Sequence, residues 1–321
     1  MEKGKFVISL DFELHWGGVE IWDLKEKKDY FTNARIGIPK MLSLFNQYQI
    51  HCTWATVGFL FAKNIDQLRK IMPDNRPTYS NNALNYYSII DQNEIGFSEA
   101  EDPFHYAVSL IDLILKTPYQ ELASHTFCHY YCNEKGQNIE QFEADTAAAQ
   151  KIAMENFGVE LKSLVFPRNQ FNKEYLEAAK KNGFKVFRSN PNVWFWQKNH
   201  GRLSPIFRAI DTLFYISRPL SFSHQEVVFE NGIIQLPASR FFRPFMYKEK
   251  SIRKIKLKRI LDEMTYAAKN NNIYHLWWHP HNFGNAVKEN MEDLEVILVH
   301  YRDLNSKFGF ESKSMGSFSR R

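Results

Sequence analysis

Six side chains able to bind a metal ion or move a proton occur in three short stretches that lie far apart in the chain. They are Asp11 and Glu13 in ISLDFELHWG, His125 and His129 in ELASHTFCHYYC, and His279 and His281 in HLWWHPHNFG. Each stretch follows an apolar run of strand length. Because the carboxyl ends of parallel strands share one face of a barrel or open sheet, the three stretches are expected to converge on one pocket. This pattern predicts a metal-dependent hydrolase.

The two histidines of the second stretch are spaced like a metal-binding pair. His125 and His129 are four residues apart, which places both imidazoles on one face of a helical turn. Together with an oxygen ligand from elsewhere they can hold Zn²⁺ and leave a position for water. An isolated HxxxH is more often a surface or packing pair. Cys128 and Cys132 also allow a structural zinc site, but Cys128 and His129 are adjacent and point in different directions, which makes that site the weaker alternative.

The acidic pair lies at the end of the first apolar run. Asp11 and Glu13 are two residues apart, so in a strand both carboxylates lie on the same face. One can bind the metal while the other accepts a proton from the bound water. Solvated acids at a strand end are the alternative. The flanking Phe12, Leu14 and Trp16 favour the first interpretation because they would partly exclude water from the pair.

Two further features can complete such a site. A histidine at the end of the run Leu276–Trp278, either His279 or His281, is suited to protonate a leaving amine. Arg168, in VFPRNQ, follows another apolar run and can orient a carboxylate or bind an anionic substrate group. The alternatives are a polar turn after a buried strand and a surface arginine.

Strand-like runs alternate with helical patterns along most of the chain. Strands are expected near residues 5–10, 51–57, 121–124, 161–166, 185–187, 233–237 and 273–278, and helices near 33–48, 103–116, 139–157, 173–182, 250–270 and 287–308. Such alternation predicts a parallel sheet with helices outside it. About seven strands without a dinucleotide-binding glycine motif favour a closed or nearly closed barrel over a Rossmann sheet.

The chain is expected to form one domain over residues 1–310, because it shows no internal repeat and no linker. Residues 72–102 are rich in Pro, Asn, Tyr and Ser and lack periodicity, so they are expected to form a loop insertion, which often acts as a lid. Residues 311–321 are rich in Ser and Arg, and we expect a flexible tail there.

Composition restricts the class of protein. The chain of 321 residues is 44% hydrophobic and 24% charged, as is ordinary for a globular protein. The aromatic share of 15% is high and fits either a bulky aromatic core or sugar stacking. Composition alone favours the core. Candidates for stacking on a sugar are Trp194, Trp196, Trp277 and Trp278.

Much of the net charge of +5 lies in the basic run at residues 248–259. Such a run suits nucleic acid, an anionic membrane surface or a phosphate-bearing substrate. The helical spacing of its isoleucines instead favours the solvated face of a helix. Because no nucleic-acid-binding motif is present, we do not expect nucleic acid as a partner.

The sequence predicts a cytoplasmic protein. It begins MEKGKFVISL, without an apolar leader, and it has no apolar run long enough to span a membrane. The three cysteines have no disulfide-framework spacing, which suits a reducing compartment. Peripheral membrane contact remains open.

The order of the motifs resembles the polysaccharide deacetylases, the NodB-homology proteins of carbohydrate esterase family four. Asp-x-Glu is followed by Ser-His-Thr-x-x-His, then Phe-Pro-Arg, then an apolar run into His-Pro. ELASHTFCHY is similar to the family's second motif, and HCTWATVGFLF is similar to one of its strands. The resemblance covers residues 5–285 and implies a distorted (β/α)₇ barrel.

The resemblance also implies roles. His125, His129 and Glu13 would bind a divalent metal, Zn²⁺ in preference to Co²⁺ or Ni²⁺, with Asp11 as the base and His279 as the acid. His281 is the second choice for the acid, and Arg168 would keep Asp11 ionised.

The chain departs from the family pattern in two places. The family's first motif has two adjacent aspartates, whereas Phe12 separates the acids here, so their roles could be reversed. The third motif reads Arg-x-Pro in the family, whereas this chain has Pro167-Arg168.

The implied activity is hydrolysis of the amide of an N-acetylated or otherwise N-acylated amino sugar, releasing acetate and a free amine. A cytoplasmic enzyme would meet this sugar as a nucleotide- or lipid-linked precursor of a surface polysaccharide or O-antigen. The alternative is a catalytically inactive deacetylase-like barrel that binds glycan or a partner protein. The departures from the family pattern favour this alternative slightly, whereas the retained acids and histidines argue against it.

Overall fold

The strands form one mostly parallel sheet. The computed structural model describes residues 2–197, 204–214, 216–230 and 232–320. Within them the strand order is β6-β7-β5-β4-β3-β2-β1-β9-β8, and β10 pairs with β1. The pairing of named strands is parallel except between β6 and β7. The strands are β1 Lys5–Phe12, β2 Cys52–Thr56, β3 Gln120–Ser124, β4 Ser163–Leu164, β5 Val186–Ser189, β6 Val228–Glu230, β7 Ile233–Pro237, β8 Arg240–Phe241, β9 Ile273–Trp278 and β10 Glu311–Lys313.

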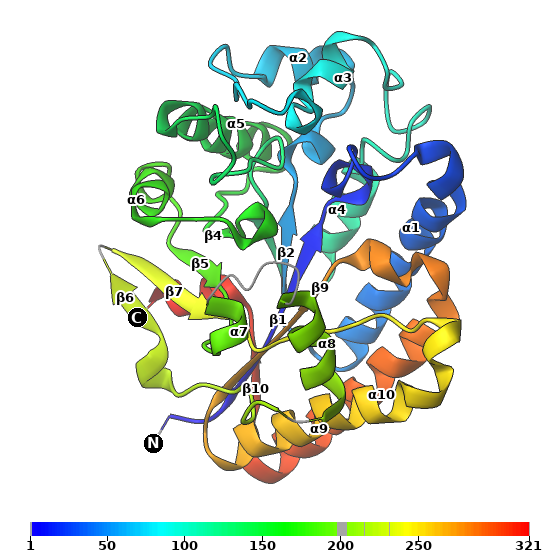
Figure 1. Ribbon diagram of the computed structural model, residues 1–321, viewed down its shortest axis with the longest axis vertical. Coiled ribbons are helices and arrows are strands. Elements are labelled where there is room, and N and C mark those ends of the chain that lie inside the picture. Colours follow the sequence, from blue (N-terminus) through cyan, green and yellow to red (C-terminus); the bar gives the residue numbers. More distant parts are fainter. Residues whose placement is uncertain (1, 198–203, 215, 231, 321) are drawn as a thin grey trace.

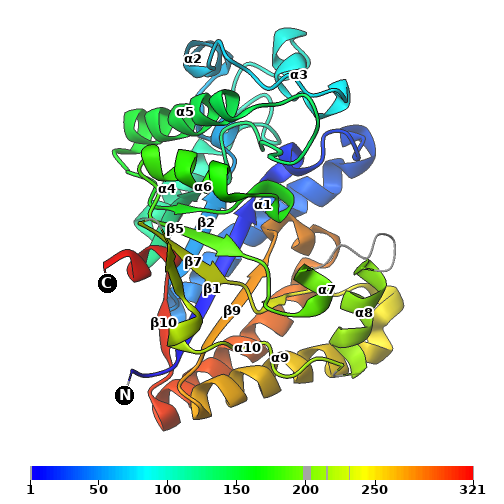
Figure 2. The same ribbon diagram turned by 60° about the vertical axis from the view of Figure 1, so that its left-hand side comes forward.

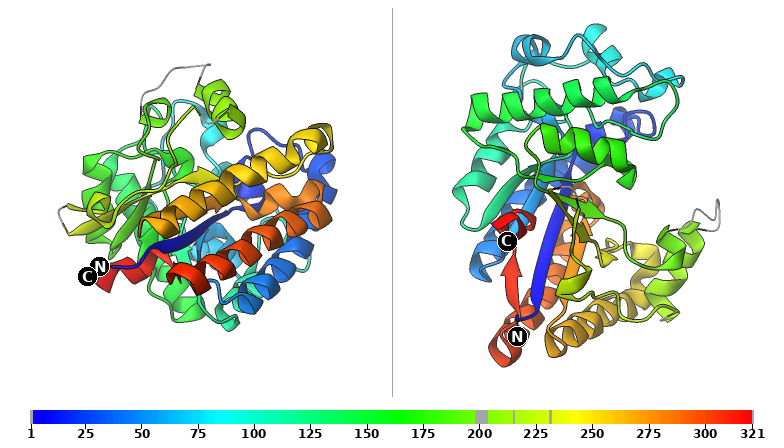
Figure 3. Two further views of the ribbon diagram at one scale, coloured as in Figure 1. Left: turned by 90° about the horizontal axis from the view of Figure 1, so that it is seen from below. Right: turned by 90° about the vertical axis from the view of Figure 1, so that its left-hand side faces the viewer.

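Helices surround the sheet (Figure 1). They are α1 Leu24–Gln47, α2 Ile65–Ile71, α3 Tyr87–Asp91, α4 Val108–Lys116, α5 Ile139–Phe157, α6 Lys173–Lys181, α7 Trp194–Gln197, α8 Ser204–Phe214, α9 Arg253–Lys269 and α10 Val287–Phe308. The long helices α9, α10 and α1 lie side by side against the sheet (Figure 3). The predicted alternation of strands and helices is confirmed.

The sheet curls into a distorted barrel because one stretch of chain pairs on both sides. β7 pairs with β5, and β8 pairs with β9. Between them, the Ala238 amide donates to the Ser189 carbonyl, and the Ser239 amide donates to the His275 carbonyl. With β7 and β8 counted as one strand, the described barrel consists of β1, β2, β3, β4, β5, β7–β8 and β9. The predicted (β/α)₇ barrel is confirmed.

Two apolar clusters hold the barrel together. The larger one lies between the strands and the helices. The smaller one includes Val7 of β1, Ala55 of β2, Ala123 of β3 and Val186 of β5. Small and β-branched side chains suit this position because the interior of a small barrel is narrow.

The C-terminal segment completes the smaller cluster. β10 pairs with the start of β1 (Figure 2), and Met315 and Phe318 are buried in the smaller cluster. The prediction of a flexible tail at 311–321 is therefore wrong for residues 311–320. Its Ser- and Arg-rich composition concealed two apolar side chains that the barrel buries.

The insertion at residues 72–102 is packed rather than extended. It contains α3, and Tyr79, Tyr86 and Tyr87 are buried. The backbone amide of Tyr131 donates to the Tyr79 hydroxyl at 2.8 Å. The hydroxyls of Tyr86 and Tyr131 are 2.9 Å apart. The insertion therefore supports the loop that follows β3, and its role as a lid stays a prediction.

The basic run at residues 248–259 contributes to a helix, as its isoleucine spacing indicates. It covers a short 3₁₀ turn and the start of α9. Arg253 pairs with Asp293 at 2.6 Å, and Lys256 pairs with Glu249 at 2.9 Å. Arg259 is buried. Several of these cations are therefore neutralised inside the fold.

Candidate active site

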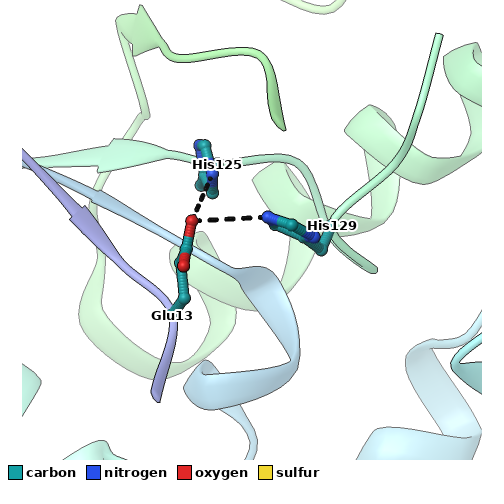
Figure 4. A group of neighbouring side chains, drawn as sticks. All are labelled: Glu13, His125 and His129. Atoms are coloured by element: carbon teal, nitrogen blue, oxygen red, sulfur yellow. Dashed lines mark hydrogen bonds and ion pairs between the residues drawn. The ribbon is translucent and has the colours of Figure 1, made fainter. Parts of the chain in front are cut away.

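The three predicted stretches meet at one carboxylate oxygen. Glu13 follows β1, and His125 and His129 lie in the loop after β3 (Figure 4). Glu13 Oε1 is 2.9 Å from His125 Nε2 and 3.3 Å from His129 Nε2. Burial opposes ionisation of Glu13, but the charge of His279 and the close contacts of the other two histidines hold its pKa well below the usual value. Glu13 is therefore an anion at neutral pH.

The loop after β3 is not the helical turn that the histidine spacing predicts. Thr126 and His129 have φ angles of 64° and 61°, in the left-handed region. Asp145 of α5 holds this loop, accepting hydrogen bonds from the Phe127 amide at 2.7 Å and the Cys128 amide at 3.0 Å. Both imidazoles do approach the same carboxylate oxygen, but the backbone between them is not the predicted helical turn. Strained non-glycine residues of this kind often occur at functional sites.

The ring nitrogens show that the site suits a cation. His125 Nδ1 is 2.8 Å from the Val165 carbonyl, which can only accept, so Nδ1 carries the proton. In the neutral ring, His125 Nε2 then directs a lone pair at Glu13 Oε1, and a cation between the two atoms relieves their repulsion. Burial lowers the pKa of His129, which favours its neutral form as well. Two imidazoles with fixed outer partners and one carboxylate are a typical zinc-binding set.

The cysteines do not belong to this set. In the part of the chain described by the structure, neither group of residues able to hold a metal contains a cysteine. Cys128 and Cys132 are buried, and burial raises their thiol pKa well above the usual value. Buried neutral thiols are poor zinc ligands, so the structure gives no support to the thiolate alternative.

Asp11 is held by an arginine that the sequence did not single out. Arg188 Nη1 and Nη2 each lie 2.7 Å from one carboxylate oxygen of Asp11, and both side chains are buried. Burial would raise the pKa of Asp11, but the charges of Arg188, His125 and His279 together outweigh it and lower the pKa. Arg188 is the next-to-last residue of the run KVFRS, in β5. The one signal for it was its position at a strand end.

Arg168 does not make the contact that we expected. It adopts a left-handed conformation after β4, pairs with Glu20, and lies 3.7 Å from Glu134. Its guanidinium also lies over the Tyr131 ring, 4.2 Å from the centroid. The expectation that Arg168 keeps Asp11 ionised is therefore wrong, because Arg188 occupies that position. Arg168 still lines the cavity, so binding of an anionic substrate group stays a prediction.

The two late histidines differ in exposure. His279 Nε2 lies 3.6 Å from Glu13 Oε1 and 3.7 Å from Asp11 Oδ2, and its side chain is 26% exposed. His281 is buried, and burial, together with the charge of His279, lowers its pKa to about 3. His281 is thus neutral at working pH and cannot act as an imidazolium donor. The geometry favours His279 for proton transfer.

A cavity of about 520 Å³ opens over these residues. Aromatic and apolar side chains form much of its wall, including Trp22, Phe241, Met246 and Trp277. Of the four tryptophans considered for sugar stacking, Trp277 lines this cavity and Trp196 lines a neighbouring one. Trp278 is buried in the larger apolar cluster, and Trp194 is exposed.

Residues 33–187 match the family model described as polysaccharide deacetylase. The chain contains a polysaccharide deacetylase domain. This match indicates a hydrolase of the carbohydrate esterase and deacetylase type. The matched region includes His125, His129 and Arg168, whereas Asp11, Arg188 and His279 lie outside it. No curated protein sequence matches the chain significantly.

Solved structures share the fold of this chain. A protein from Mycobacterium smegmatis described as a polysaccharide deacetylase aligns with a TM-score of 0.60 and 10% identity, over 99% of this chain and 90% of that one. One from Pseudomonas aeruginosa PAO1, with the same description, gives 0.56 and 9%, over 98% and 89%. The PuuE allantoinase gives 0.56 and 10%, over 98% and 88%. Identities this low establish the barrel fold alone. In the described residues, no helix is long and apolar enough to cross a bilayer.

Proposed function

We propose that this deacetylase catalyses the metal-dependent hydrolysis of the amide of an N-acylated amino sugar, most simply an N-acetyl group. The observation that carries the proposal is the convergence on Glu13 Oε1. Three imidazole nitrogens lie between 2.9 and 3.6 Å from this one oxygen. The Asp11–Arg188 pair lies beside them and the cavity lies above them.

His125, His129 and Glu13 would hold the metal. Zn²⁺ fits two imidazoles and one carboxylate, with Co²⁺ or Ni²⁺ as alternatives. When bound, such an ion polarises the amide carbonyl and lowers the pKa of a coordinated water molecule. The outer hydrogen bonds of His125 to Val165 and of His129 to the Tyr131 hydroxyl keep both Nε2 atoms directed at the site.

Asp11 is proposed as the base. It lies on the cavity floor, and the lowered pKa keeps it ionised and ready to accept a proton. Arg188 fixes both of its oxygens and also lies 4.2 Å over the Trp277 ring, so the carboxylate cannot rotate freely. A base held in one orientation spends less entropy on reaching the reacting water.

His279 is proposed as the acid. As water oxygen bonds to the acyl carbon and the C–N bond breaks, the departing nitrogen needs a proton, and His279 Nε2 can donate it. The proton accepted by Asp11 can replace it, since the two groups are 3.7 Å apart. The products are acetate and a free amine on the sugar.

The proposal extends to the substrate and the compartment. A cavity of about 520 Å³ accommodates a sugar ring, and Trp277 and Phe241 offer apolar faces to it. We propose a nucleotide- or lipid-linked precursor of a surface polysaccharide or O-antigen, processed in the cytoplasm.

Amine release tests this function. Metal-stripped protein would be assayed with and without Zn²⁺ or Co²⁺ on UDP-N-acetylglucosamine, N-acetyl and N-formyl amino sugars, and N-acetylated oligosaccharides. We expect turnover that metal restores. The His279→Gln variant should lose far more kcat than His281→Gln while still binding metal. Tight metal binding without turnover on any of these substrates would instead support an inactive barrel that binds glycan or a partner protein.

A further inference from the structure

A second cavity adjoins the reaction cavity and shares part of its wall. It has a volume of about 240 Å³ and extends between the barrel and helices α7 and α8. The residues common to both cavities are Phe241, Arg243, Trp277 and His279. Because His279 is the proposed acid, this shared wall lies next to the reaction centre. Arg243 is the arginine in this shared wall, and its guanidinium carries a full positive charge.

The carboxylates that line the two cavities already have partners. Asp11 pairs with Arg188, and Glu13 contacts the histidines. Asp211, in the second cavity, pairs with Arg240 at 2.9 Å. In contrast, Arg243 makes no hydrogen bond or ion pair with any residue that the structure describes. Its guanidinium thus has donors available for a ligand.

The backbone around Arg243 is held in place. The Phe242 amide donates to the Trp277 carbonyl at 2.8 Å, and the Phe245 amide donates to Asn290 Oδ1 at 2.7 Å. Phe242 and Phe245 are both buried. The backbone of Arg243 is therefore already ordered, so less conformational entropy is lost when its side chain binds a ligand. Apolar walls also strengthen a charge-assisted hydrogen bond by excluding water.

We propose that Arg243 binds an anionic group of the substrate, a phosphate or a carboxylate, at the junction of the two cavities. This inference rests on the proposed function, because it takes the reaction cavity to hold an acylated amino sugar. A guanidinium matches both anions through paired N–H donors. Arg168, the other arginine of the reaction cavity, already pairs with Glu20. Arg243 is therefore the residue that would select charged substrates over neutral ones.

Calorimetric binding of three sugars to the metal-loaded protein tests this inference without requiring turnover. The probes are N-acetylglucosamine, N-acetylglucosamine 1-phosphate and N-acetylglucosaminuronic acid. We expect at least one charged sugar to bind on the order of 10-fold more tightly than the neutral one, as for one charge-assisted contact. The stronger of the two charged probes identifies phosphate or carboxylate as the natural group.

Variants assign the preference to the residue. Arg243→Gln should remove the preference, whereas Arg243→Lys should keep part of it. Arg302→Gln, at an exposed position lining a separate cavity, should behave like the wild type. Thermal unfolding would confirm that each variant is folded.

Two results would overturn the inference: equal binding of charged and neutral sugars by the wild type, or a preference that survives Arg243→Gln. Amine release measured on the same samples separates this outcome from failure of the proposed function. Charge preference without turnover would contradict the hydrolysis alone, and turnover without charge preference would contradict the role of Arg243 alone.

Discussion

Two groups of histidines flank the turn after β1, and they differ in how their ring nitrogens are used. In the first, His105 Nδ1 lies 2.7 Å from Asp102 Oδ2, and its Nε2 lies 2.8 Å from His15 Nδ1. His15 Nε2 in turn lies 2.9 Å from the Trp22 carbonyl. Every ring nitrogen in this closed group has a partner within the protein.

The second group is open. His125 and His129 each use Nδ1 for an outer hydrogen bond, while both Nε2 atoms point at Glu13 Oε1. Both groups are buried, and both contain an acid. Burial and residue type therefore do not distinguish a metal site from a structural network. The difference lies in the convergence of the two Nε2 atoms, together with His279 Nε2, on one carboxylate oxygen.

The largest expected effect comes from removing one of the proposed metal ligands of the open group. His125→Ala removes one of the proposed ligands, so we expect metal affinity to fall by more than about 100-fold, beyond the usual effect of an outer-shell change. Amine release should be lost with it. Metal content and turnover measured on the same preparation would check this. Full metal loading and normal turnover in this variant would show that the metal lies elsewhere.

The acid of the closed group can also be compared with Asp11, which lies beside the open group, since Asp102 is paired by a histidine and Asp11 by Arg188. Arg188→Leu leaves a buried carboxylate without its cation, which typically costs about 3–5 kcal/mol of stability. The pKa of Asp11 should rise, because burial would no longer be opposed by the guanidinium. Urea unfolding and the pH profile of kcat would measure both effects. A variant with unchanged stability would mean that Asp11 is solvated rather than clamped.

Disrupting the closed group should lower the stability of the protein without lowering its metal affinity. His105→Ala removes one hydrogen-bond partner from each of Asp102 and His15, which we expect to cost about 1–3 kcal/mol. Metal affinity should stay close to that of the wild type. Zinc titration combined with urea unfolding separates the two effects. Loss of the metal in this variant, with the protein still folded, would erase the distinction between the groups.

A glycine beside the open group offers a smaller perturbation. A Cβ atom at Gly17 would lie 1.9 Å from Glu13 Oε2, so Gly17→Ala must displace the carboxylate. We expect metal affinity to fall by about 10-fold. Gly37→Ala is the matched control, because its Cβ would lie 3.6 Å from Met291 Cε in ordinary contact. Equal affinity in the two variants would mean that Glu13 is not a ligand.

The pH dependence of stability is the mildest test. Burial lowers the pKa of His15 from 6.5 to about 4, so the unfolded chain binds a proton more readily than the folded protein between these values. The contribution of His15 is present above pH 6.5 and is lost as the pH falls toward 4. For metal-stripped protein, we expect about 1 kcal/mol of extra destabilisation between pH 7.5 and 5.5 from this residue. His15→Gln should flatten the slope of unfolding free energy against pH, and an unchanged slope would argue against a buried neutral ring.

Much of the fold follows from sequence periodicity. Residues 139–157 and 287–308 form α5 and α10 with the predicted bounds, because their apolar spacing and terminal glycines are clear. The closure of the barrel through Ala238 and Ser239 was not predictable, since pairing partners leave no local pattern. The C-terminal strand was not predicted, because the composition of so short a segment does not show which of its side chains are buried.

The site was predictable where strand geometry controls it. Glu13 and His279 lie within contact distance because parallel strands end together. Arg188 was missed because a single arginine near the end of KVFRS forms no motif. The left-handed backbone of Thr126 and His129 also has no sequence signature in non-glycine residues.

Anomalous diffraction at the zinc absorption edge, from crystals grown with Zn²⁺, addresses the metal site most directly. We predict one strong peak in contact with Glu13 Oε1, His125 Nε2 and His129 Nε2. The closed group at His15 and His105 should show none. A peak at the cysteines, or no peak at these three atoms with zinc at saturating concentration, would contradict the metal-dependent mechanism.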